Sequence, residues 1–185
     1  IVTVANGDVC DTMGRATESG HLVAVDPMCQ MMAMHLYDGL LKIVPIKGSG
    51  LAEAFNLRLE ELCVKDIQFL HNATKPTVVV IHEDPRETRY VKTYEINLKD
   101  KEISDGSWTQ CPVDPTASML IPVPGPYGGA IVVGESTASY LNGSAAQPKV
   151  VALPKLTVMR SYGRIDPDGT RHLLADWQGQ IYICV

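Results

Sequence analysis

The sequence predicts an all-β fold, and the first observation behind this prediction is a long-range repeat. The pair Asp26-Pro27 returns as Asp166-Pro167, and Gly39 returns as Gly179 at the same offset of 140 residues. Between these anchors, both copies read as a strand, a tight turn and a second strand. This pattern predicts a β-hairpin that occurs at least twice.

The second observation is the spacing of two weaker hairpin-like segments that lie between the two clear copies. With Met32, Val78, Ala130 and His172 taken as equivalent, the steps are 46, 52 and 42 residues. Hairpins at this spacing are typical of β-propeller blades, each of which is a four-stranded antiparallel meander. We therefore expect a β-propeller fragment of about four blade units.

The other strand-like runs fit this frame in chain order. An inner strand is expected before each hairpin, at residues 21–26, 64–70, 117–124 and 159–166. An outer strand is expected after the first three hairpins, at residues 53–60, near Trp108 and at residues 148–154. With a further outer strand at residues 1–5, residues 1–185 are predicted to form a partial propeller with three whole blades and three strands of a fourth.

The segment from Leu51 to Leu62 allows a second interpretation. Leu51, Phe55, Leu59 and Leu62 have helical spacing, whereas Phe55, Leu57 and Leu59 alternate with polar residues as in a strand. The pattern alone does not decide between the two. The position of the segment in the repeat favours a strand.

Both ends of the chain are strand-like, with IVTV at the start and IYICV at the end. Unpaired edge strands invite aggregation. We therefore expect the chain alone to be aggregation-prone or to need a partner, or else to be one part of a larger protein. An alternative is that residues 1–5 complete the last blade and close a small four-bladed ring.

Composition excludes several classes of function. The 185 residues carry a net charge of −5 and no local cluster of Lys and Arg, which disfavours a nucleic-acid surface. No apolar run reaches the roughly 18 residues that a membrane span needs. The five cysteines are widely spaced and form no C-x-x-C pair. They are expected to be reduced thiols of a nuclear or cytosolic protein.

Two short motifs and the histidines are candidates for catalytic or metal-binding sites, but none has the sequence context that such a site needs. Residues 134–138 look like a hydrolase nucleophile elbow, but no room is left for the helix that must follow the serine. Residues 166–169 look like a calcium loop, but Arg171 and Trp177 stand where Gly and Glu are needed. The histidines show no metal-ligand spacing. We therefore expect no catalytic residue, no metal and no cofactor, and the protein is not expected to be an enzyme.

Several longer runs are specific enough to compare with a known family. They include GRATESG, VDPMCQM, LYDGLLKIVPI, AFNLRLEEL, RYVKTYEINLKDKE, PYGGAIVVGE and GRIDPDGTRHLLADWQG. Together they resemble the first propeller of the large triple-propeller adaptors of cullin-RING ubiquitin ligases. The resemblance runs along essentially the whole chain and covers the middle of one seven-bladed propeller.

This resemblance implies a protein-interaction scaffold that acts in ubiquitination and DNA repair. In the family, the first and third propellers form a clamp for substrate receptors, many of them WD40 propellers, and for viral hijacker proteins. The cullin scaffold is bound by a propeller that this chain lacks. Damage recognition belongs mainly to the receptor, so no direct contact with nucleic acid is implied, and the family implies a location in the nucleus and cytoplasm.

A second hypothesis keeps the architecture and changes the partners. Related triple-propeller subunits belong to the pre-mRNA splicing or polyadenylation machinery. The runs LYDG, RLEEL and VKTYE favour the ubiquitin-ligase adaptor.

The expected partner surface follows from propeller geometry. Links from an outer strand to the next inner strand lie on the same face as the central hairpin turns. The link at residues 10–19 carries Arg15 and Glu18, which could pair with charges on a partner. Asn56 and Arg58 should point to solvent, opposite to the apolar side chains of the same strand. The resemblance implies receptor contacts on this face, so these four residues are the candidate contacts; the alternative for Arg15 is that it only holds its own loop.

Overall fold

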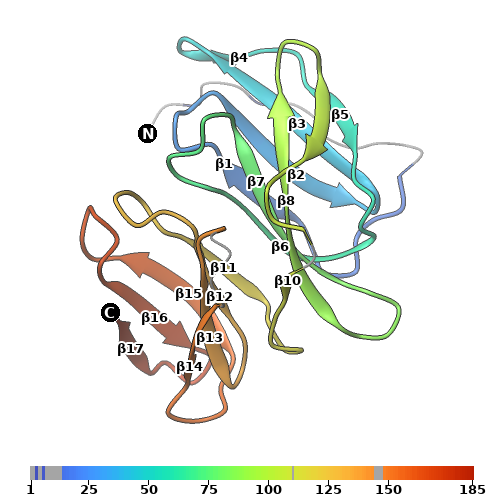
Figure 1. The fold of residues 1–185 in the computed structure, drawn as a ribbon. Coiled ribbons are helices and arrows are strands. Elements are labelled where there is room, and N and C mark those ends of the chain that lie inside the picture. Colours follow the sequence, from blue (N-terminus) through green and yellow to red (C-terminus); the bar gives the residue numbers. More distant parts are fainter. Residues whose placement is uncertain (1–2, 4–5, 7–13, 110, 144–147) are drawn as a thin grey trace.

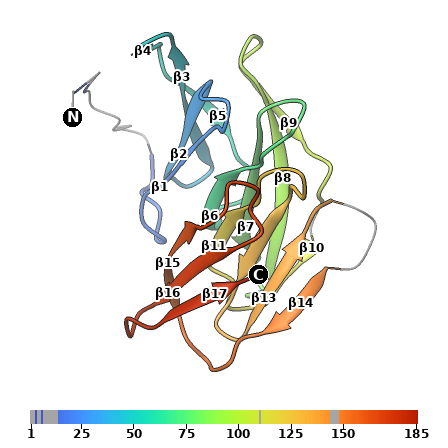
Figure 2. The same cartoon turned by 90° about the vertical axis from the view of Figure 1, so that its left-hand side faces the viewer.

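The computed structural model describes residues 3, 6, 14–109, 111–143 and 148–185, and these residues contain strands but no helix. The strands form four antiparallel sheets that follow one another in chain order (Figure 1). The innermost strand of the second sheet contacts the innermost strands of the first and third. Figure 2 shows the sheets splaying apart from their inner strands, as blades of a propeller do.

The first two sheets have a split outer position. The first contains β1 (Leu22–Val25), β2 (Met31–Tyr37), β3 (Leu40–Lys47), β4 (Gly50–Leu51) and β5 (Phe55–Arg58). The second contains β6 (Cys63–Phe69), β7 (Thr77–Glu83), β8 (Arg89–Asn97), β9 (Glu102–Asp105) and β10 (Cys111–Pro112). Both β4 and β5 pair with β3, and both β9 and β10 pair with β8. Each sheet is therefore a meander whose outermost place is shared by two short strands.

The last two sheets are simpler. The third contains β11 (Met119–Pro122), β12 (Ala130–Val133), β13 (Thr137–Leu141) and β14 (Lys149–Ala152). The fourth contains β15 (Met159–Arg164), β16 (His172–Asp176) and β17 (Ile181–Cys184). Every neighbouring pair of strands in both sheets is antiparallel.

The core lies between the sheets. One cluster of buried apolar side chains joins the first and second sheets, a second joins the second and third, and a third joins the third and fourth. Strand β7 contributes side chains to two of these clusters. Val78 and Val80 belong to the first cluster, whereas Val79 and Ile81 belong to the second. Because both faces of this strand are buried, its apolar residues form a continuous run instead of alternating with polar ones.

The predicted all-β propeller fragment is confirmed, with each inner strand and hairpin at its expected place. Residues 51–62 form no helix. Leu57 and Leu59 are buried while Asn56 and Arg58 are exposed, which is the alternation of a half-buried strand.

One element differs from the prediction. Trp108 itself lies in no strand, because the outer place of the second sheet is split into β9 and β10 on either side of it. Its backbone is bound to Thr93, whose N–H donates to the Trp108 carbonyl at 3.0 Å and whose hydroxyl accepts from the Trp108 N–H at 2.9 Å. The indole is buried in the core between the second and third sheets.

The predicted outer strand at residues 1–5 lies outside the described residues apart from Thr3. The division into whole and partial blades therefore stays a prediction. Within the described part of the chain, the first and fourth sheets each turn one apolar face away from their only neighbour. Val23 and Val25 lie on the first of these faces, and Ile181 and Ile183 lie on the last.

Candidate functional site

The links and hairpin turns meet on one face, which we call the hairpin face. At the first sheet, the Asp38 N–H donates to the Arg15 carbonyl at 2.9 Å, and Ala16 forms a bridge with Tyr37. Leu59, in the next link, donates its N–H to the carbonyl of Gly39 at 2.9 Å. The structure therefore confirms the geometric rule that links and turns share a face, although residues 10–13 of the first link lie outside the described residues.

Buried or half-buried carboxylates hold the same face together at the third and fourth sheets. Asp114, in a link, accepts hydrogen bonds from the hydroxyls of Ser136 at 2.7 Å and Thr137 at 2.6 Å in the neighbouring hairpin turn. Asp176, in a turn, accepts from the hydroxyl of Thr157 in the neighbouring link at 2.9 Å. Partial burial acts to raise the pKa of Asp114, but its hydrogen bonds outweigh this and lower the pKa to about 2.

Arg15 and Glu18 lie where the sequence predicts. The Arg15 guanidinium is 3.0 Å from Glu18 Oε1, and its Nε is 3.6 Å from Asp38 Oδ2. Both side chains remain about three-quarters exposed, at 75% and 78%. Arg15 therefore does hold its own loop against the hairpin turn, and it also keeps most of its surface available to a partner.

Asn56 and Arg58 lie on the outer strand of the same sheet. In the register of β3 and β5, Arg58 faces Leu40 and Asn56 faces Lys42. Both side chains are exposed, as expected. Arg58 is thus placed beside the turn that also contacts Arg15, while Asn56 lies two residues further down the strand. Binding of a partner by these four residues stays a prediction.

Sequence reasoning missed a polar network between the first two sheets. Lys92 on β8 lies 3.3 Å from Glu61 Oε1 and 3.1 Å from Asp105 Oδ1, with its ammonium 4.6 Å from the centre of the Tyr94 ring. The Tyr94 hydroxyl donates to Glu61. Hydrogen bonds to Tyr94 and Asp105 and the charge of Glu61 raise the pKa of Lys92, although burial acts to lower it. The RLEEL and VKTYE runs, which carried the resemblance, therefore join two sheets to each other.

Sequence reasoning also missed apolar side chains on the hairpin face. Leu62, Leu156 and Trp177 are 65%, 76% and 62% exposed. Trp177 stands in the hairpin turn between β16 and β17, and its N–H donates to the carbonyl of Val158 in the neighbouring link at 3.0 Å. The only signal in the sequence was an aromatic residue inside a turn. Trp is enriched at protein interfaces, and this face exposes apolar as well as charged side chains.

The nucleophile-elbow interpretation is excluded by the contacts of Ser136. Its hydroxyl donates to Asp114, and at neutral pH a carboxylate with a pKa of about 2 is too weak a base to activate a serine. In the segment that looks like a calcium loop, the Asp166 carboxylate accepts hydrogen bonds from Arg171 at 2.6 Å and from the Thr170 hydroxyl at 2.9 Å. Within the described ranges, no group of three or more His, Cys, Asp or Glu side chains could hold a metal ion.

Replacing Ser136 by alanine should not change the ability of the protein to catalyse ester hydrolysis, because we expect it to have none. We expect neither the wild type nor the variant to hydrolyse 4-nitrophenyl acetate above the buffer rate. Loss of one partly exposed hydrogen bond should cost about 0.5–1.5 kcal/mol of stability. Ester hydrolysis by the wild type that disappears in the variant would overturn this assignment.

Asp66 should make the stability of the protein depend on pH. Its carboxylate accepts hydrogen bonds from the N–H of Ile67 at 2.8 Å and from the N–H of Leu120 in the third sheet at 2.7 Å. Burial nevertheless dominates and raises its pKa from 3.8 to about 7. The unfolded chain therefore loses this proton first, and the contribution of Asp66 to stability should fall as pH rises from about 4 to about 7.

Urea denaturation of the wild type and of Asp66→Asn between pH 4 and 8 tests this prediction. The free energy of unfolding should fall more steeply with rising pH in the wild type than in the variant. Parallel pH profiles would show that Asp66 stays ionised throughout.

No helix in the described part of the chain is long and apolar enough to span a membrane.

Comparison with known proteins gives a whole-chain match. The family model described as the first β-propeller of RSE1/DDB1/CPSF1 matches residues 1–184. The chain is 48% identical over 187 aligned residues to a DNA damage-binding protein 1 of Oryza sativa subsp. japonica. It is 46% identical to a DNA damage-binding protein 1 of Solanum lycopersicum and to DNA damage-binding protein 1b of Arabidopsis thaliana. Each alignment covers all of this chain but only 17% of the relative.

Proposed function

This chain belongs to the family of the first β-propeller of RSE1/DDB1/CPSF1, and from that premise we propose that it is part of a protein-interaction scaffold in a cullin-RING ubiquitin ligase. It forms one jaw of the clamp that receives substrate receptors, and it acts in ubiquitination and DNA repair without catalysing a reaction. The observation that carries the proposal is the match to DNA damage-binding protein 1 at 48% identity over the whole chain.

The physical character of the chain supports a scaffold. Three apolar clusters and the Lys92 network join successive sheets, so the hairpin face is a rigid surface that needs little ordering when a partner binds. That face combines the exposed ion pair of Arg15 and Glu18 with the exposed side chains of Leu156 and Trp177. Apolar anchors surrounded by charged groups are typical of protein interfaces.

The proposed partners are WD40-type substrate receptors, together with viral proteins that take their place. The cullin scaffold would be bound by another propeller of the full-length protein. The net charge of −5 does not favour direct binding of nucleic acid. A protein with this role would act in the nucleus and cytoplasm.

The family model is also compatible with a second candidate, because its description names RSE1 and CPSF1 beside DDB1. A triple-propeller subunit of the splicing or polyadenylation machinery would have the same fold with different partners. The relatives named above, which carry the name DNA damage-binding protein 1, make it the weaker candidate.

Affinity purification of the full-length protein, followed by mass spectrometry, distinguishes the two. We expect a cullin scaffold and WD40 proteins to be recovered in near-stoichiometric amounts. Recovery of splicing or polyadenylation subunits without a cullin would reject the ligase assignment in favour of the second candidate.

A further inference from the structure

Trp177 is exposed at a position where the first sheet covers the equivalent aromatic side chain. The offset of 140 residues makes Trp177 the counterpart of Tyr37, at the end of β2. There, Gly14 of the preceding link lies so close to the Tyr37 ring that a Cβ atom on the glycine would be 2.5 Å from it. Trp177 is 62% exposed, so the link before the fourth sheet leaves its aromatic residue uncovered.

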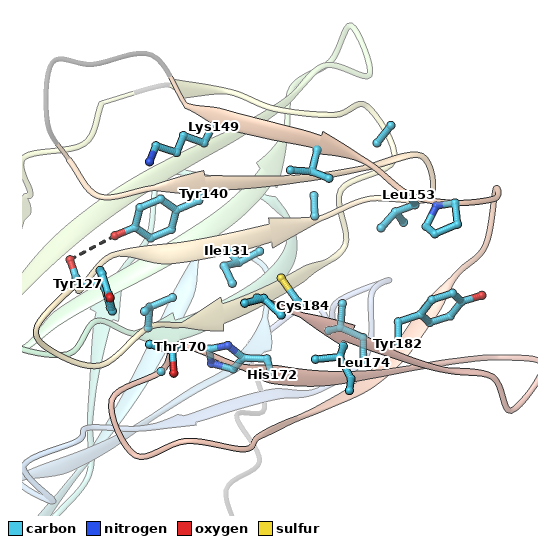
Figure 3. Close-up of a pocket in the computed structure, with 18 residues that line it drawn as sticks. Tyr127, Ile131, Tyr140, Lys149, Leu153, Thr170, His172, Leu174, Tyr182 and Cys184 are labelled. Atoms are coloured by element: carbon cyan, nitrogen blue, oxygen red, sulfur yellow. Dashed lines mark hydrogen bonds between the residues drawn. The ribbon is translucent and has the colours of Figure 1, made fainter.

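A buried carboxylate fixes the backbone around Trp177. The side chain of Asp176 is 0% exposed. It accepts four hydrogen bonds, from the N–H groups of Gln178 at 3.0 Å and Gln180 at 2.8 Å and from the hydroxyls of Thr157 at 2.9 Å and Tyr182 at 3.1 Å. Figure 3 shows the Tyr182 side chain with its hydroxyl pointing away from the cavity between the third and fourth sheets. Asp176 therefore holds its own turn together and ties the turn to the preceding link.

The same carboxylate fixes the link on both sides of Leu156. The Lys155 ammonium lies 3.5 Å from Asp176 Oδ2, and the Thr157 hydroxyl donates to the same oxygen at 2.9 Å. Leu156 stands between these two residues and is 76% exposed. Two large apolar side chains, Leu156 and Trp177, are thus presented to solvent by two segments that one buried group joins.

The position of the following link in the first sheet shows that such a link does not cover this aromatic residue. There, Leu59 in the following link donates its N–H to the Gly39 carbonyl at 2.9 Å, and a Cβ atom on Gly39 would be 3.5 Å from Leu62. The counterpart of Gly39 is Gly179. A link placed in the same way after the fourth sheet would lie over Gly179, two residues beyond Trp177.

We propose that Trp177 and Leu156 form an apolar anchor site on the hairpin face, which receives an apolar side chain of a WD40-type substrate receptor. The inference rests on the proposed function, and it adds a contact point on the fourth sheet to the Arg15 and Glu18 pair on the first. Trp and other large side chains that become buried at an interface supply much of its binding energy.

The surroundings of the site favour an apolar partner side chain over a charged one. Lys155 and Asp176 neutralise each other, so no unpaired charge of this network faces the partner. Asp176 acts as a positioning residue, since it holds both segments in place before the receptor arrives. Binding then loses little conformational entropy of the turn and the link.

The affinity of the full-length protein for a purified WD40-type receptor tests the proposal. Trp177→Ala should lower this affinity at least about tenfold. The melting temperature of the unbound protein should stay unchanged, because an exposed side chain contributes little to stability. The matched control is Tyr127→Ala, since Tyr127 is 58% exposed but lies between β11 and β12, at the end of β12 opposite to the hairpin turn. This control should bind the receptor as the wild type does.

A double-mutant cycle tests the positioning role of Asp176. Asp176→Asn should lower receptor affinity about threefold or more in the wild-type background and should have no further effect in Trp177→Ala. A general loss of stability would lower affinity equally in both backgrounds. The comparison of Trp177→Ala with the wild type stands even if Asp176→Asn does not fold.

Four results would overturn the proposal. Wild-type affinity of Trp177→Ala, or equal losses for Trp177→Ala and Tyr127→Ala, would remove the anchor site and leave the proposed function intact. A large fall in the melting temperature of unbound Trp177→Ala would show that another part of the same protein covers the side chain. A wild-type protein that binds no WD40 receptor would reject the proposed function itself, and the anchor site with it.

Discussion

Replacing Lys92 by alanine should lower the free energy of unfolding by about 3–5 kcal/mol, because it leaves a buried carboxylate without its cation. The Lys92 side chain is 10% exposed, and that of its partner Glu61 is 9% exposed. The variant also loses the contact of the ammonium with the Tyr94 ring. Urea denaturation of the wild type and the variant measures the difference.

Lys75→Ala is the matched control. Lys75 pairs with Glu95 at 2.9 Å, but its side chain is 65% exposed, so water screens the pair. An exposed pair of this kind contributes about 1 kcal/mol or less. If the two variants lost equal stability, the network between the first and second sheets would be no stronger than a surface ion pair.

Replacing Phe69 by alanine should also lower the free energy of unfolding by about 3–5 kcal/mol, because it opens a cavity in a close-packed core. Phe69 is 1% exposed and belongs to the cluster between the first and second sheets. Leu62→Ala removes a large side chain that is 65% exposed, and it should change stability by no more than about 0.5 kcal/mol. A similar small effect at Phe69 would mean that the two sheets do not depend on each other for stability.

The repeat in the sequence predicted the sheets because blades are built from local meanders. Hairpins such as β2–β3 and β16–β17 join strands that are neighbours in the chain, so turn residues and apolar spacing report them directly. The same repeat decided the segment at residues 51–62 in favour of strand, where periodicity alone was ambiguous. Repeat position carried more information there than local pattern.

The contacts between sheets could not be predicted in the same way. Lys92 meets Glu61 because one sheet lies on another, and no sequence period reports which side chains face each other across that interface. The insertion of Trp108 between β9 and β10 is likewise set by its backbone contacts with Thr93. Both arrangements depend on tertiary packing.

The candidate contact residues show the same difference between features set by local pattern and features set by tertiary packing. Exposure of Asn56 and Arg58 followed from alternation in a strand, and the structure has both exposed. The ion pair of Arg15 with Asp38 depends on how the link lies against the hairpin turn, which the sequence does not show. The exposed side chains of Leu156 and Trp177 were missed because apolar residues in this sequence usually signal core.

The central claim is that the hairpin face receives a substrate receptor, and the affinity of the full-length protein for a WD40-type receptor tests it most directly. The informative variant exchanges the two charges, as Arg15→Glu with Glu18→Arg, since the pair within the loop can still form. The exchange removes the 3.6 Å pair of Arg15 with Asp38, but both exchanged side chains are about three-quarters exposed, so stability should fall by no more than about 1 kcal/mol. We expect receptor affinity to fall about 5- to 10-fold as charges on the partner meet the wrong sign, with cullin binding equal to the wild type and only a small decrease in melting temperature. Unchanged receptor affinity, or a loss that follows a loss of stability, would contradict the account.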